Sequence, residues 1–132
     1  LVKDTRALVN EVRPDCIISA AVKPNLYVAR ERYFQEWNVW LAAGYLDWVV
    51  PMNYSPNKRE FARNIDVIND NFPKKYREKI IMGIALHNQT PSEAAEKIKF
   101  SRLGQFPRIS VFSYNIMIKD YRYSSVFDEE NH

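Results

Sequence analysis

Four apolar runs recur at regular intervals along the chain, and an amphipathic stretch precedes the first run and separates each from the next. The runs span residues 16–22, 46–52, 80–86 and 109–114. They are apolar at successive positions, which is typical of parallel strands covered on both faces. Because a helix between two strands returns the chain to the same edge, all four strands are expected to run in one direction. The pattern therefore predicts the α/β class.

Helix signals fill the stretches between the runs. Residues 32–43 predict one helix, with Gly44 at its carboxyl end. Apolar residues spaced by three and four positions predict a second helix, which Asn57 starts and Pro73 ends. Residues 90–93, Thr-Pro-Ser-Glu, predict a capping box at the start of a third helix. The helices and strands together predict about four strand–helix units.

The number of units sets the expected architecture. A closed (β/α)8 barrel needs about 250 residues, whereas this chain has 132. Residues 1–123 are therefore expected to form a domain resembling half of such a barrel, as a fragment of a larger chain. After Tyr114 the pattern weakens, and residues 124–132 are predicted to be a loose tail.

Composition and charge narrow the class of protein. A hydrophobic content of 46% indicates an ordered globular chain. The 19 basic and 16 acidic residues are evenly spread, so they do not favour a nucleic-acid partner. Cys16, the single cysteine, is predicted to be a small core residue at the start of a strand. No apolar stretch reaches the roughly 20 residues of a membrane span.

Polar and aromatic residues follow each predicted strand. The carboxyl ends of parallel strands meet at one edge, where barrels and open α/β sheets bind ligands. Amide and phenol groups can exchange hydrogen bonds with sugar hydroxyls, and aromatic faces can stack on sugar rings. The alternative is that Asn residues only make turns and that Tyr residues pack the rim. The candidate substrate-binding residues are Lys23, Asn25, Asn53, Tyr54, His87, Asn88, Tyr114 and Asn115.

Three consecutive segments resemble a bacterial family. They are residues 34–41, with Gln-Glu-Trp followed by Trp-Leu, residues 44–47, Gly-Tyr-Leu-Asp, and residues 51–54, Pro-Met-Asn-Tyr. The family is the glycosyl-hydrolase-like group of uncharacterised surface and secreted proteins, which are predicted (β/α)8 barrels. Segments similar to the family's fifth, seventh and eighth strands are residues 19–22, 82–85 and 111–114.

The resemblance implies a function. It suggests the C-terminal half of a TIM-type (β/α)8 barrel that forms one wall of a cleft for a polysaccharide or oligosaccharide. It also implies a location in the cell envelope or outside the cell, and a glycosidase in the full-length parent. No cofactor is expected, and no cluster with metal-ligand spacing predicts a metal.

Catalytic carboxylates are the missing part of this expectation. Glycoside hydrolysis uses two carboxyl groups, about 5 Å apart for retention or about 6.5–9.5 Å apart for inversion. None of the four strand ends presents an acid, and the nearest candidates are Glu31 and Glu36. The catalytic acids are therefore expected in the absent N-terminal half. Asp47 lies at the amino end of its strand and is expected to hold the preceding turn or a basic neighbour.

Two other functions stay open. One is a non-catalytic saccharide-binding or scaffold protein that keeps the barrel wall without the acids. The other is a stand-alone open α/β domain that binds an unrelated ligand. In a half-barrel the first and last strands would be unpaired edges, which favours a dimer or pairing with another chain. The stand-alone domain is instead expected to be a stable monomer.

Overall fold

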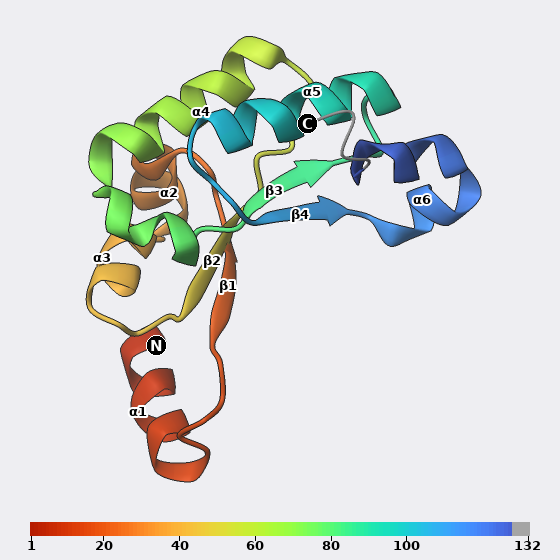
Figure 1. Ribbon diagram of the computed structural model, residues 1–132. Helices are drawn as coiled ribbons and strands as arrows, with labels where there is room; N and C mark the ends of the chain where they lie inside the picture. The colour runs from red at the N-terminus through yellow and green to blue at the C-terminus, as the bar shows by residue number, and fades with distance from the viewer. Residues whose placement is uncertain (128–132) are drawn as a thin grey trace.

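The computed structural model describes residues 1–127, in which helices alternate with short parallel strands (Figure 1). This arrangement agrees with the predicted α/β class. The strands are β1 (Ser19–Val22), β2 (Trp48–Pro51), β3 (Met82–Ala85) and β4 (Ile109–Phe112). The α-helices are α1 (Val2–Val12), α2 (Leu26–Tyr33), α3 (Trp37–Ala42), α4 (Lys58–Asn71), α5 (Pro91–Leu103) and α6 (Tyr114–Lys119). The 3₁₀ helices are η1 (Lys74–Lys79) and η2 (Tyr121–Phe127).

The strands form two parallel pairs, β1 with β2 and β3 with β4. Isolated parallel bridges, Val49 to Ile80 and Met52 to Gly83, connect β2 to β3. The amide of Ile81 also donates a 2.9 Å hydrogen bond to the carbonyl of Val49. Neighbouring strands are thus consecutive in the chain, and their carboxyl ends point the same way.

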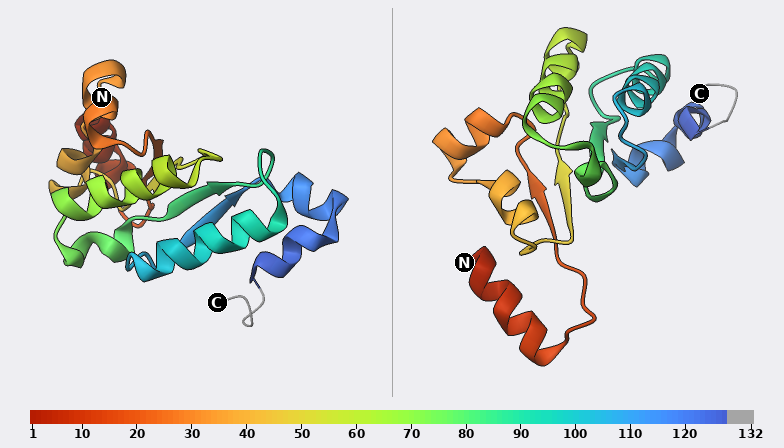
Figure 2. Two further views of the ribbon diagram at one scale, coloured as in Figure 1. Left: turned by 90° about the horizontal axis from the view of Figure 1, so that it is seen from above. Right: turned by 60° about the vertical axis from the view of Figure 1, so that its left-hand side comes forward.

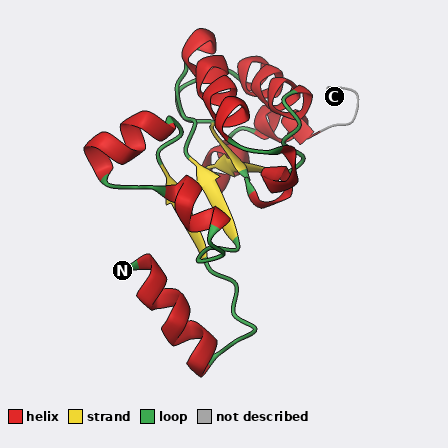
Figure 3. Ribbon diagram, turned by 90° about the vertical axis from the view of Figure 1, so that its left-hand side faces the viewer, coloured by secondary structure: helices red, strands yellow, loops and turns green. Residues whose placement is uncertain are grey.

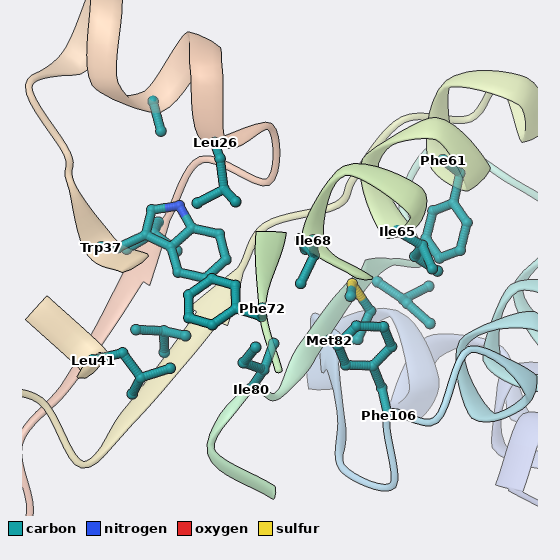
Figure 4. Close-up of a cluster of buried hydrophobic side chains, with 14 of the residues drawn as sticks. Leu26, Trp37, Leu41, Phe61, Ile65, Ile68, Phe72, Ile80, Met82 and Phe106 are labelled. Carbon is teal, nitrogen blue, oxygen red and sulfur yellow. The ribbon is translucent and has the colours of Figure 1, made fainter. Parts of the chain in front are cut away.

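The hydrophobic core lies between one face of the strands and the helices. Figure 2 shows α4 and α5 side by side, with α5 along the β3–β4 pair. The strands contribute alternate residues, because successive side chains point to opposite faces. In the close-up of Figure 4, Trp37 stacks on Phe72 with ring centroids 5.2 Å apart. Other fully buried residues of this core are Val22, Leu41, Val49, Phe61, Ile65, Ile68, Ile80, Met82, Ile84, Ile98 and Phe106.

The opposite face of the strands is more open. Ala21 in β1 and Ser110 in β4 are exposed, and Phe112 is 54% exposed. The prediction of strands covered on both faces is therefore wrong for β1 and β4, whose burial alternates along the strand. A continuous apolar run does not distinguish a strand covered on one face from a strand covered on both.

The predicted helix over residues 32–43 is also wrong, because two helices occupy this region. Phe34 adopts a left-handed conformation, with φ of 54°, and ends α2. The side chain of Gln35 then accepts a 2.9 Å hydrogen bond from the amide of Lys23. The indole of Trp37 donates a 3.0 Å hydrogen bond to the carbonyl of Lys23. These bonds fold the segment back against the end of β1.

The other predicted helix boundaries are confirmed. The side chain of Asn57 caps α4 by accepting a 3.1 Å hydrogen bond from the amide of Glu60. Thr90 and Glu93 form the reciprocal bonds of a capping box at the start of α5. Gly44 follows α3 with a φ of 74°, a conformation that favours glycine.

The amino end of the sheet contains Asp47 in its expected structural role. Its carboxylate accepts hydrogen bonds from Arg6 of α1, at 2.6 Å, and from the amide of Ile18, at 2.8 Å. Burial opposes the effect of these bonds, but together with the charge of Arg6 they lower the pKa of Asp47. This ion pair holds α1, which stands apart from the other helices (Figure 3).

Two further predictions concern Cys16 and the C-terminal tail. Cys16 is exposed and precedes β1, so its predicted place in the core is wrong. The strand begins only at Ser19, and the segment before it is an extended link from α1. The 3₁₀ helix η2 reaches into the predicted tail, and residues 128–132 lie outside the described residues.

Candidate functional site

Three aromatic side chains meet at the carboxyl ends of adjacent strands. Tyr54 follows β2, His87 follows β3, and Phe112 ends β4. The rings of Tyr54 and Phe112 stack with centroids 5.8 Å apart and planes inclined by 16°. The His87 ring stands edge-on to both, at 6.4 Å from Tyr54 and 6.2 Å from Phe112. These three residues are called the aromatic cluster.

The aromatic cluster is accessible to a ligand. Phe112 is 54% exposed, His87 is exposed and Tyr54 is half-buried. Burial raises the pKa of Tyr54, so its hydroxyl stays protonated and can donate a hydrogen bond well above neutral pH. The cluster therefore combines flat apolar surface with a phenol and an imidazole.

A buried lysine braces the loops that carry the cluster. The ammonium of Lys97 in α5 donates hydrogen bonds to the carbonyls of Ser55 at 2.9 Å and Pro56 at 3.1 Å, and to the side-chain oxygen of Gln89. Only 3% of Lys97 is exposed, and burial lowers its pKa. The three bonds tie the loop after β2 to the loop after β3.

One additional bond joins these loops, and another attaches the loop after β3 to η2. The side-chain nitrogen of Asn88 donates a 2.8 Å hydrogen bond to the carbonyl of Tyr54. The hydroxyl of Tyr123 in η2 donates a 2.7 Å bond to the carbonyl of Gln89. The position of Tyr54 relative to His87 is thus fixed by contacts between the loops as well as by the sheet.

The candidates after β1 have structural contacts. The ammonium of Lys23 lies 4.6 Å from the centroid of the Tyr33 ring. The side-chain oxygen of Asn25 caps α2, where it accepts bonds from the amides of Tyr27 at 3.1 Å and Val28 at 3.2 Å. Helix capping, a structural role, therefore accounts for Asn25.

Asn53 does not join the site. It is 1% exposed, and its side chain donates to the carbonyl of Phe61 at 3.0 Å and accepts from Asn64 at 2.9 Å. Its side chain points into the helix layer, whereas that of the next residue, Tyr54, points to the open face. The reason is the alternation of side chains along an extended chain.

Tyr114 and Asn115 lie just beyond the cluster. Both are exposed, and they form the first turn of α6. Within residues 1–127, no ring contact or hydrogen bond joins either of them to Tyr54, His87 or Phe112. They are placed near the same sheet edge without belonging to the cluster.

The two acidic candidates lie on the α2–α3 segment. Glu31 is exposed in α2, and Glu36 is exposed at the start of α3, where its side chain makes no capping bond. Among the described residues, no group of three or more His, Cys, Asp or Glu side chains could hold a metal ion. This part of the chain therefore offers binding groups at the strand ends without a paired carboxylate beside them.

Sequence reasoning missed Phe112 and Lys97. Phe112 could have been found by assigning each residue of the last apolar run to one face of a strand. Ile109 and Val111 pack on the core, and because side chains alternate along a strand, Phe112 lies on the opposite face. Lys97 carries no comparable signal, because a lysine on an amphipathic helix is usually solvated.

No protein-family model matches this chain, and no curated protein or solved structure matches it significantly. Within residues 1–127, none of the helices has the length and apolar character required to cross a membrane.

Proposed function

We propose that the chain is part of a glycoside hydrolase-like (β/α)8 barrel, in which it forms one wall of a carbohydrate-binding cleft. The observation that carries this proposal is the aromatic cluster, in which Tyr54 stacks on Phe112 beside His87. Parallel strands that neighbour one another in chain order, and the resemblance of residues 34–54 to a family of predicted barrels, support the same architecture.

Each group in the wall has a role in this proposal. The exposed ring of Phe112 offers an apolar face to the C–H side of a sugar ring. The Tyr54 hydroxyl and the His87 imidazole exchange hydrogen bonds with sugar hydroxyls. The side-chain nitrogen of Asn88 is bonded to Tyr54, which leaves its oxygen as an acceptor for ligand. Lys23, which directly follows β1, is the cationic residue among the candidate substrate-binding residues.

The same proposal places hydrolysis outside this chain. Two carboxyl groups are needed for glycoside hydrolysis, and the strand ends of the described residues present none. Residues 1–132 are therefore expected to bind saccharide without cleaving it, and Glu31 and Glu36 remain only weak catalytic candidates. The envelope or secreted location of the family that the chain resembles is part of this proposal.

The proposal is tested by calorimetric titration of the full chain with neutral and N-acetylated oligosaccharides, including cellohexaose and chitohexaose. Replacing Phe112 with Ala is expected to weaken binding about 2- to 12-fold, because an aromatic contact contributes about 0.5–1.5 kcal/mol. Phe34→Ala is the control, since Phe34 is 84% exposed and lies outside the cluster. Unchanged affinity in Phe112→Ala, or no heat of binding with any saccharide, would contradict the proposal.

A further inference from the structure

A group of polar and charged residues, separate from the aromatic cluster, lies at the amino ends of β3 and β4, near η1 and the end of α5. Two adjoining hollows, of about 430 Å³ and 330 Å³, share Lys74, Arg77 and Gln105 in their walls. Arg102 and Glu78 line the smaller one. The five residues named here are called the basic hollow. The aromatic cluster lies at the other ends of the same strands, so the two sites are separate.

Arg77 is a buried cation that has no counter-ion among the residues the structure describes. It is 7% exposed, and no carboxylate of residues 1–127 forms an ion pair with it. Its Nη1 donates a 3.2 Å hydrogen bond to the carbonyl of Phe72, and its guanidinium lies 5.2 Å from the centroid of the Phe106 ring. Its Nε is shielded and has no acceptor among the described residues. Burial lowers the pKa of this group.

A buried charge with unmade hydrogen bonds is costly unless a partner compensates it. Among the described residues only the Nη1 of Arg77 donates to a protein acceptor, and Arg77 lines both hollows, so its Nη2 is available to a ligand there. An anion in the hollow would neutralise the guanidinium and accept from Nη2. The structure thus contains half of a charge pair at the wall of a hollow that is open to the surface.

The charge and size of the basic hollow define the ligand. Lys74, Arg77 and Arg102 give three positive charges and Glu78 gives one negative charge, so the lining has a net charge of two positive. Each hollow exceeds the roughly 30 Å³ of a liquid water molecule by about tenfold, which leaves room for a hydrated anion. The amide of Gln105 can add a hydrogen bond.

We propose that the basic hollow binds a dianionic tetrahedral oxyanion, namely a phosphate group. A dianion is attracted more strongly than a monovalent carboxylate by a lining with a net positive charge. Arg is suited to this role because its planar group donates several bonds in fixed directions. The proposal is independent of the saccharide-binding proposal, because it concerns other residues at the other end of the strands.

The first experiment titrates the full chain with inorganic phosphate and follows ³¹P NMR linewidths and the melting temperature. Phosphate and sulfate are expected to raise the melting temperature above its value in sodium chloride of equal ionic strength, because a ligand that binds only the folded state stabilises it. An equal effect of sodium chloride would show general screening and would overturn the proposal.

Variants test the residues. Lys74→Gln combined with Arg102→Gln is expected to weaken phosphate binding about tenfold; both residues are exposed, so the fold should tolerate the changes. The matched control is Lys3→Gln with Arg30→Gln, which removes the same charge from exposed positions outside the hollow. Equal weakening in the control would overturn the proposal.

A third arm distinguishes two sources of the phosphate group. Glycerol 3-phosphate is titrated beside inorganic phosphate. Tighter binding of glycerol 3-phosphate assigns the site to a phosphomonoester, and tighter or equal binding of inorganic phosphate assigns it to the free ion. Arg77→Lys keeps the charge but loses the planar donor group, and it is expected to weaken either ligand. Full affinity in a folded Arg77→Lys variant would contradict the role given to Arg77.

Discussion

Lys97 and Arg77 are both buried cations, but they lie near opposite ends of the strands and their donors are used differently. Lys97 is 3% exposed, and its ammonium donates to three oxygen atoms near the carboxyl ends of β2 and β3. Arg77 is 7% exposed near the amino ends, where it donates to one carbonyl and its Nε has no acceptor within residues 1–127.

The difference shows that burial of a charge does not by itself mark a binding site. Lys97 has used its three donors inside the protein, so it has nothing left to offer a ligand, and its role is to brace the loops. Arg77 has donors to spare beside a hollow with a net positive lining. A buried cation indicates a ligand only when its hydrogen bonds are incomplete.

The largest expected effect comes from removing the satisfied cation. Lys97→Met leaves the carbonyls of Ser55 and Pro56 without their donor, and it should lower the free energy of unfolding by about 3 kcal/mol. Urea denaturation measures the change, and Lys99→Met on the exposed side of α5 is the control. A Lys97→Met variant as stable as the control would show that the three bonds contribute little.

Removing the unsatisfied cation should cost less. Arg77→Met loses one hydrogen bond and the contact with Phe106, but it also removes a buried donor without a partner. In phosphate-free buffer the free energy of unfolding should fall by no more than about 1 kcal/mol. When the same urea denaturation is repeated in phosphate, the difference in unfolding free energy between wild type and Arg77→Met should increase, because only the wild-type chain would gain stability from the ion. A loss as large as that of Lys97→Met in phosphate-free buffer would contradict the comparison.

The smallest effect is a pH dependence at Lys97. Its pKa is lower in the folded state than in the unfolded chain, where it is about 10.4. Between the folded and the unfolded pKa of Lys97, the unfolded chain therefore binds more protons than the folded chain. The free energy of unfolding rises with pH between these two pKa values, and this gain is lost as pH falls through the folded pKa. The unfolding free energy of wild type minus that of Lys97→Met should increase across the window. A flat difference would indicate an ordinary pKa for Lys97.

Several features of this protein follow from the sequence alone. The four apolar runs predict the positions of β1 to β4, and their separation by helices predicts that the strands are parallel. Asn57 and the Thr90–Glu93 pair predict the starts of α4 and α5, and the structure confirms both. These signals are local, because a cap or a turn depends on residues within a few positions. They also indicate that Tyr54 and His87 lie near each other, since parallel strands end at one edge.

Only the tertiary structure decided which of these residues face a ligand. Asn53 and Tyr54 are adjacent, yet one is bonded inside the helix layer and the other joins the aromatic cluster. The break at Phe34 likewise depends on two bonds, in which the Lys23 amide donates to Gln35 and the Trp37 indole donates to the Lys23 carbonyl.

The burial and hydrogen bonding of Lys97 and Arg77 are the features that the sequence predicts least. The bonds of Lys97 to the carbonyls of Ser55 and Pro56 span 42 and 41 residues. Arg77 lies among the basic residues Lys74, Lys75 and Lys79, a pattern typical of solvated surface, and the Phe106 ring that packs on it comes from the segment before β4. Whether a long charged side chain is buried, and whether its donors are satisfied, depends on which distant segments fold around it, and no local pattern encodes that outcome.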